Sequence, residues 1–153
     1  MDLEPGVTRS SDGYKSAAWN VVGHTYTPKV VTRDVFVWHA VLPDATFVPP
    51  HIHPTQDEWI TVLDGTLEIV LGTGPDADVQ HAKAGDTIRM PRALPHGIFN
   101  QSGATATALF GVAPAQRLFD LFTKLDGVTD PEELVRISAE HDVEFLPPDP
   151  ADG

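Results

Sequence analysis

Short apolar runs separated by turn residues make up most of the chain up to residue 114. The runs recur about every ten residues, and Gly, Pro and Asp gather between them. Turn signals at intervals of roughly 8–12 residues are typical of β-sandwiches and barrels. We therefore expect an all-β fold whose clearest strands cover residues 34–42, 58–63, 66–71, 79–82, 87–90, 97–100 and 105–112. Asp64-Gly65 between two alternating runs predicts a hairpin that joins 58–63 to 66–71.

The run at 34–42 is apolar almost throughout, which predicts a strand buried on both faces. Trp38 and His39 point to opposite faces of it, and the pattern allows either a cavity position or a core position for each. Residues 17–22, with Trp19, suit either a first strand or an arm that covers a partner. His24 is expected at the surface or in a hydrogen bond, with a pocket position as the alternative.

The hydrophobic period changes from two to 3.6 after residue 114. Leu118, Leu121, Phe122 and Leu125 share one face of an amphipathic helix that ends before Gly127. Residues 130–141 begin with an acidic cap, a proline and two glutamates, which predicts a second helix. We expect both helices to pack outside the barrel or at a dimer interface. The chain is thus divided into an arm (1–16), a barrel (17–114) and a C-terminal helical extension (115–153).

Composition narrows the classes of function. The chain of 153 residues suits one domain. It carries 22 acidic and 10 basic residues, a net charge of −12, which argues against nucleic-acid binding because phosphate contacts need a basic face. The absence of cysteine excludes disulfides and thiolate metal sites. No signal peptide and no membrane-length apolar run are visible, so we expect a cytoplasmic protein without a membrane partner.

Metal-binding chemistry is suggested by the segment 44–65. His51 and His53 are two residues apart on an extended segment, so their imidazoles point to one face. Glu58 opens the next run and returns to that face if the two runs pair antiparallel. Two imidazoles and a carboxylate are typical ligands of a divalent transition metal. Asp57 is the weaker candidate for the carboxylate, and Gln56 is either a turn residue or a partner that orients a histidine.

A second segment, 85–100, contributes His96 in a turn-rich loop. Together the segments carry H-x-H, four residues, Glu58, six residues and Gly65, followed by Gly85, five residues, Pro91, and then His96 and Asn100. These two motifs resemble those of the cupin superfamily over roughly residues 18–114. The family pattern has glycine where this chain has Ala45 and Ala93. Because alanine disfavours only the conformations with positive φ, these departures concern loop geometry and not the ligands.

The resemblance implies a jelly-roll cupin β-barrel with one divalent metal ion inside it. The matching positions make His51, His53, Glu58 and His96 the metal ligands. Fe²⁺ is the first expectation, and Ni²⁺, Mn²⁺, Zn²⁺, Co²⁺ and Cu²⁺ suit the same set. By position near the ligands, we expect the substrate to contact Trp38, Phe47, Gln56, Ile60, Ile98, Phe99 and Phe110.

The motifs are similar to those of small quercetin-dioxygenase-like cupins. They imply a metal-dependent dioxygenase acting on a small hydrophobic or aromatic substrate that chelates the metal, with Glu58 as the catalytic base. The alternatives are a redox-neutral enzyme (isomerase, decarboxylase or polyketide aromatase/cyclase), a non-catalytic binding module and a storage protein. Resemblance to small cupins also implies a homodimer.

Overall fold

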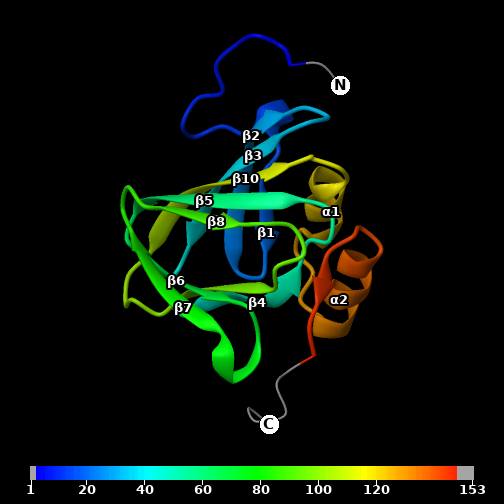
Figure 1. Ribbon diagram of the computed structural model, residues 1–153. Helices are drawn as coiled ribbons and strands as arrows, with labels where there is room; N and C mark the ends of the chain where they lie inside the picture. Colours follow the sequence, from blue (N-terminus) through cyan, green and yellow to red (C-terminus); the bar gives the residue numbers. More distant parts are fainter. Residues whose placement is uncertain (1–2, 148–153) are drawn as a thin grey trace.

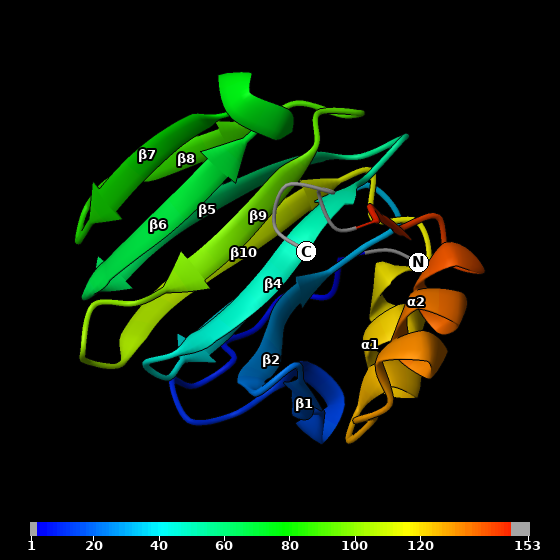
Figure 2. The same ribbon diagram turned by 90° about the horizontal axis from the view of Figure 1, so that it is seen from below.

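Two antiparallel sheets facing each other form the body of the protein in the computed structural model, which describes residues 3–147. The first sheet has the order β1-β2-β3-β10-β5-β8 and the second β11-β4-β9-β6-β7. Figures 1 and 2 show the two sheets as stacked layers, with both helices beside each other at one side. This arrangement confirms the predicted all-β jelly-roll barrel with two C-terminal helices.

The first sheet consists of β1 (Trp19–Val21), β2 (His24–Val31), β3 (Phe36–Leu42), β5 (Asp57–Asp64), β8 (Thr87–Met90) and β10 (Ala106–Ala113). The second consists of β4 (Thr46–Ile52), β6 (Thr66–Leu71), β7 (Asp78–Lys83), β9 (His96–Asn100) and β11 (Glu144–Phe145). Two short 3-10 turns lie at Tyr14–Ser16 and Gly74–Asp76. The outermost parts of the predicted arm and extension, residues 1–2 and 148–153, lie outside the described residues.

Alternation along each strand separates the core from the outer surface. In β3, Phe36, Trp38, Ala40 and Leu42 are at most 2% exposed, whereas the residues between them are half-buried. The prediction of a strand buried on both faces is therefore wrong for β3. Its apolar outer positions are only partly covered, because one face of the sheet packs on the barrel interior and no second layer of residues 3–147 covers the other.

The corner at Asp64-Gly65 joins the two sheets instead of closing a hairpin. Strand β5 pairs with β10 and β8, while β6 pairs with β9 and β7. Gly65 has φ 84°, and a Cβ there would lie 2.9 Å from the Cα of Ala106. The hairpin prediction is wrong because the glycine allows a sharp turn between layers, and each strand finds its partners elsewhere.

The two predicted C-terminal helices are confirmed as α1 (Leu118–Leu125) and α2 (Pro131–Ala139). The four apolar residues predicted to share one face of α1 are all buried, and the Asp130 side chain caps α2 by accepting from the backbone N–H of Glu132 at 3.1 Å. Helix α1 packs against β1, while α2 packs against α1 and β11. Neither helix, nor any other in the part of the chain that the structure describes, is long and apolar enough to cross a bilayer.

Candidate metal centre

A β-bulge orients the first histidine toward the barrel interior. Val48 pairs with Ile98 and His51 with His96, so β4 advances three residues while β9 advances two. The extra residue falls at the consecutive prolines 49 and 50, and it reverses the alternation of β4. Val48 and His51 are therefore both buried, although regular alternation would place them on opposite faces.

Four side chains from both sheets meet inside the barrel. His51 and His53 come from β4 and the residue after it, His96 from the start of β9, and Glu58 from β5 in the opposite sheet. One ligand atom from each lies within 4.8 Å of the others, and all four residues are buried. The expected pairing of Glu58's strand with β4 is wrong, because the carboxylate reaches the histidines across the barrel. Asp57 is exposed and pairs with Arg92 at 3.1 Å, so it does not compete with Glu58.

Each imidazole is held by a contact to its Nδ1 atom. The acceptor is the Pro49 carbonyl for His51 (2.8 Å), the Gln56 side-chain oxygen for His53 (3.0 Å) and the Leu94 carbonyl for His96 (3.2 Å). Because an oxygen acceptor requires an N–H, Nδ1 carries a proton in each ring and Nε2 faces the cluster. Gln56 is itself fixed, since its amide donates to the carbonyls of residues 114 and 115. The orienting role considered for Gln56 is the one the structure supports.

Burial and neighbouring charges set the protonation states of the side chains in the cluster. Burial, together with the neighbouring His96 and His53, lowers the pKa of His51 to about 3. Burial also opposes charge on His53, but the Glu58 carboxylate 3.0 Å from its Nε2 raises the pKa of His53 above its usual value. Burial opposes ionisation of Glu58 as well, yet His53 and His96 hold the pKa of that carboxyl well below its usual range. Glu58 is therefore an anion at neutral pH.

The arrangement fits a divalent transition metal. Three imidazole Nε2 atoms and a carboxylate oxygen converge, and His96 Nε2 is fully buried with no hydrogen-bond partner among the described residues. A buried nitrogen without a partner is unfavourable unless a ligand completes it. Nitrogen and oxygen donors of this kind suit Fe, Ni, Mn, Zn, Co or Cu.

Comparison with known proteins agrees with this geometry. The family model described as cupin domain matches residues 37–112, which include all four ligand positions. The chain belongs to the cupin family. A solved RmlC-like cupin from Shewanella frigidimarina superposes with a TM-score of 0.65 at 13% identity, covering 78% of this chain and 99% of that one. KdgF from Halomonas sp. gives 0.60 at 18% identity, covering 73% and 99%. Both likenesses concern the fold.

Curated relatives resemble part of this cupin. Germin-like protein 9-3 of Oryza sativa subsp. japonica is 38% identical over 84 residues, which are 52% of this chain and 39% of the relative. Germin-like protein subfamily 2 member 1 of Arabidopsis thaliana is 29% identical over 107 residues, 69% of this chain and 48% of the relative. The chain thus spans less than half the length of these curated relatives.

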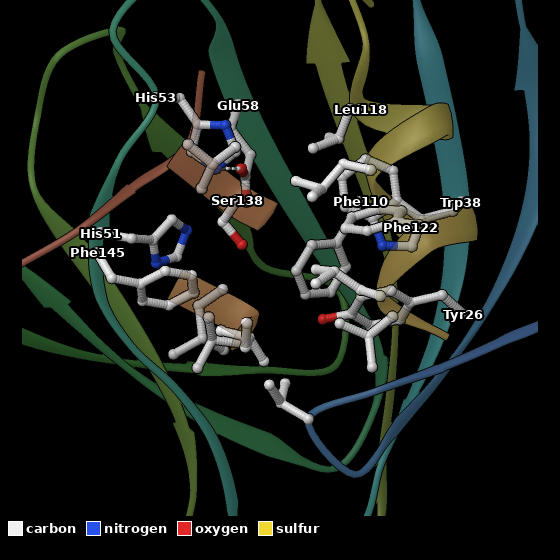
Figure 3. Close-up of a pocket in the computed structure, with 18 residues that line it drawn as sticks. Tyr26, Trp38, His51, His53, Glu58, Phe110, Leu118, Phe122, Ser138 and Phe145 are labelled. Atoms are coloured by element: carbon white, nitrogen blue, oxygen red, sulfur yellow. Dashed lines mark ion pairs between the residues drawn. The ribbon is translucent and has the colours of Figure 1, made fainter. Parts of the chain in front are cut away.

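A largely apolar cavity of about 50 Å³ adjoins the ligands of the cupin site (Figure 3). Trp38, Ile98 and Phe110 line it, together with the ligands His51, His53 and Glu58. Of the other predicted contacts, Ile60 is fully buried in the core outside the lining. Gln56 lies behind His53.

The prediction that Phe47 and Phe99 line the cavity is wrong. Phe47 is 50% exposed, and its ring stacks on that of Phe99 with centroids 5.7 Å apart. The two residues are register partners on the outer face of the second sheet. Strict alternation would place Phe47 on the face of His51, but the bulge between them reverses the direction of the side chains.

The sequence did not identify most of the cavity wall, and eleven of the 18 lining residues lie outside the match to the cupin domain. These residues come from β1, β2 and the C-terminal segment, outside the region that matches the cupin domain: Val21, Val22, Tyr26, Leu118, Leu121, Phe122, Leu125, Leu134, Ser138, Val143 and Phe145. Their apolar periodicity predicted burial but not the surface they would cover. Tyr26 also forms a buried hydrogen bond with His24, 3.1 Å from phenol oxygen to Nδ1. His24 is thus hydrogen-bonded, as expected, and it does not line the cavity, which was the alternative.

Proposed function

We propose that this cupin is a metal-dependent dioxygenase that acts on a small hydrophobic or aromatic substrate able to chelate the metal. One observation carries the proposal: three oriented Nε2 atoms and an ionised carboxylate lie beside a mostly apolar cavity. An octahedral ion held by these four ligands would keep about two positions for substrate and dioxygen, and would activate both.

The protein's own groups have defined tasks in this proposal. The Nδ1 contacts hold the imidazoles of His51, His53 and His96 in one orientation, so no reorganisation accompanies substrate binding. The Glu58 carboxylate, which is ionised at neutral pH, takes the proton of a substrate enol or phenol. The apolar wall, including Phe110 and Phe122, excludes water and strengthens these charge interactions.

Cavity size supports a small substrate. A volume of about 50 Å³ corresponds to roughly three to five water molecules, at about 10–15 Å³ each. Small enolisable diketones and catechols suit this space better than flavonols do. The apolar lining favours a substrate with an apolar body next to its chelating group.

Oxygen uptake tests the proposal directly. We expect the Fe²⁺-loaded protein to consume oxygen with one or more members of a panel of 1,3-diketones and catechols. His96→Ala should abolish both metal retention and uptake, whereas His81→Ala, which removes an exposed histidine, should preserve both. Turnover that continues unchanged under anaerobic conditions would exclude an oxygenase.

A redox-neutral reaction is the second candidate, and the Tyr26–His24 pair favours it. Figure 3 places the Tyr26 oxygen across the cavity from His51 and His53, and burial together with the Glu58 charge raises the pKa of Tyr26, which keeps its proton. A phenol in this position can return a proton to a substrate polarised by the metal. Full activity with Zn²⁺, and loss of solvent-deuterium incorporation in Tyr26→Phe, would support this candidate over the dioxygenase.

A further inference from the structure

One buried hydroxyl at the cavity has no partner. Among residues 3–147, four buried side-chain atoms lack a hydrogen bond: His24 Nε2, Trp38 Nε1, His96 Nε2 and Ser138 Oγ. His96 Nε2 faces the other metal ligands, and His24 does not line the cavity. Trp38 makes a T-shaped contact with Phe122 at 5.1 Å, in which an aromatic face can accept an N–H. Ser138 therefore supplies the unpartnered hydroxyl of the lining among the residues that the structure describes.

The Ser138 hydroxyl belongs to α2 and is directed into the cavity. The residue is 0% exposed, and Figure 3 shows its oxygen pointing between His51 and the aromatic side chains of Phe110 and Phe122. Serine within a helix commonly bonds the carbonyl one turn earlier, but the Ser138 hydroxyl makes no such bond. Burying a hydroxyl without a partner is unfavourable, so a molecule in the cavity is expected to complete it.

The position of Ser138 is fixed by its backbone and by the neighbouring helix. Its carbonyl accepts the N–H groups of His141 and Val143 at 2.9 and 3.0 Å. The His141 ring contacts the Ile137 carbonyl through Nδ1 at 2.8 Å, and Lys124 of α1 through Nε2 at 3.0 Å. These bonds tie the end of α2 to α1. A hydroxyl held in this way is preorganised for recognition.

We infer that Ser138 is a specificity-determining residue that binds a second polar group of the substrate. The substrate then has a metal-chelating end, an apolar body and, beyond it, a hydroxyl or carbonyl oxygen within reach of α2. A serine hydroxyl both donates and accepts, so either oxygen type can satisfy it. The inference rests on the proposed function, because it uses the metal as the first point of attachment.

Paired chelating probes test this inference without knowledge of the natural substrate. The Ni²⁺-loaded protein is titrated with alkanehydroxamic acids of increasing chain length, each ending in methyl or, at the same position, in hydroxyl. At one chain length, we expect the hydroxyl-terminated probe to bind about tenfold more tightly than its methyl counterpart. Ser138→Ala should remove this preference while leaving metal content and methyl-probe affinity unchanged.

Two controls separate the possible outcomes. Thr123→Ala removes an exposed hydroxyl from α1 and should keep the preference, and Ser138→Thr, which retains a hydroxyl, should keep part of it. If metal and probes bind but no preference depends on Ser138, the inference is overturned and the proposed function stands. If the wild-type protein retains no metal, the proposed function fails and this inference with it. Binding of metal without any hydroxamate also contradicts the inference.

Discussion

Two alanines occupy backbone conformations that favour glycine, and replacing them should stabilise the protein. Ala45 and Ala93 stand at glycine positions of the cupin motifs, and their φ angles are 64° and 67°. Both turns have the left-handed backbone conformation, although alanine and not glycine occupies the position. Both turns support the site, because the Ala45 N–H donates to the Asn100 carbonyl at 2.8 Å and that of Ala93 to the His53 carbonyl at 2.9 Å.

The expected gain follows from two opposing terms. A left-handed conformation costs a residue with a Cβ about 1–2 kcal/mol. Glycine loses more backbone entropy on folding, at a cost of about 0.5–1 kcal/mol relative to alanine. Both methyl groups are on exposed residues, so their removal forfeits little apolar burial. Ala45→Gly and Ala93→Gly should therefore each raise the free energy of unfolding by about 0.5–1 kcal/mol.

Chemical denaturation of the metal-free protein measures this gain, and Ala77→Gly is the matched control. Ala77 has φ −61°, so the same substitution there should destabilise the protein by about 0.5–1 kcal/mol. A gain of 1 kcal/mol corresponds to a rise in Tm of roughly 2–4 °C for a chain of this size. Equal destabilisation at all three positions would refute the reasoning, because backbone strain would then contribute nothing.

Three further predictions concern the metal ligands and the buried histidines. Gln56→Ala should weaken metal affinity by about 10–100-fold by releasing His53, whereas Gln80→Ala, on the surface, should not; competition titration with a chelator measures both. Metal binding near neutral pH should release a proton, because the Glu58 carboxylate raises the pKa of His53 in the metal-free protein; calorimetry in buffers of different ionisation enthalpy measures it, and zero release would contradict the pairing. Burial lowers the pKa of His24 to about 4, so folding favours its neutral form. The free energy of unfolding should therefore be unaffected by this residue above about pH 6.5 and should decrease as the pH falls toward 4. The loss reaches about 3 kcal/mol, and it should be absent from the pH profile of His24→Leu.

Local patterns in the sequence were sufficient to identify the four candidate metal ligands and most helices and strands. The spacing of His51, His53, Glu58 and His96 matched the cupin motifs, and all four meet in the structure. The period of 3.6 and the cap at Asp130 predicted both helices. These features depend on residues near one another in the chain or on a motif that spans the fold. The six-residue interval to Gly65 in the cupin motif also favoured Glu58 over Asp57, and Asp57 is exposed in the structure.

Tertiary structure decided which strands are neighbours and which side chains face the cavity. Asp64-Gly65 turns between sheets, because β5 and β6 each pair with strands distant in sequence. Phe47 faces outward because the register with β9 places a bulge before His51. Ser138 joins the cavity wall only through the packing of α2. Alternation and amphipathicity specify that a face is buried, but the surface it meets is selected by contacts between segments far apart in the chain.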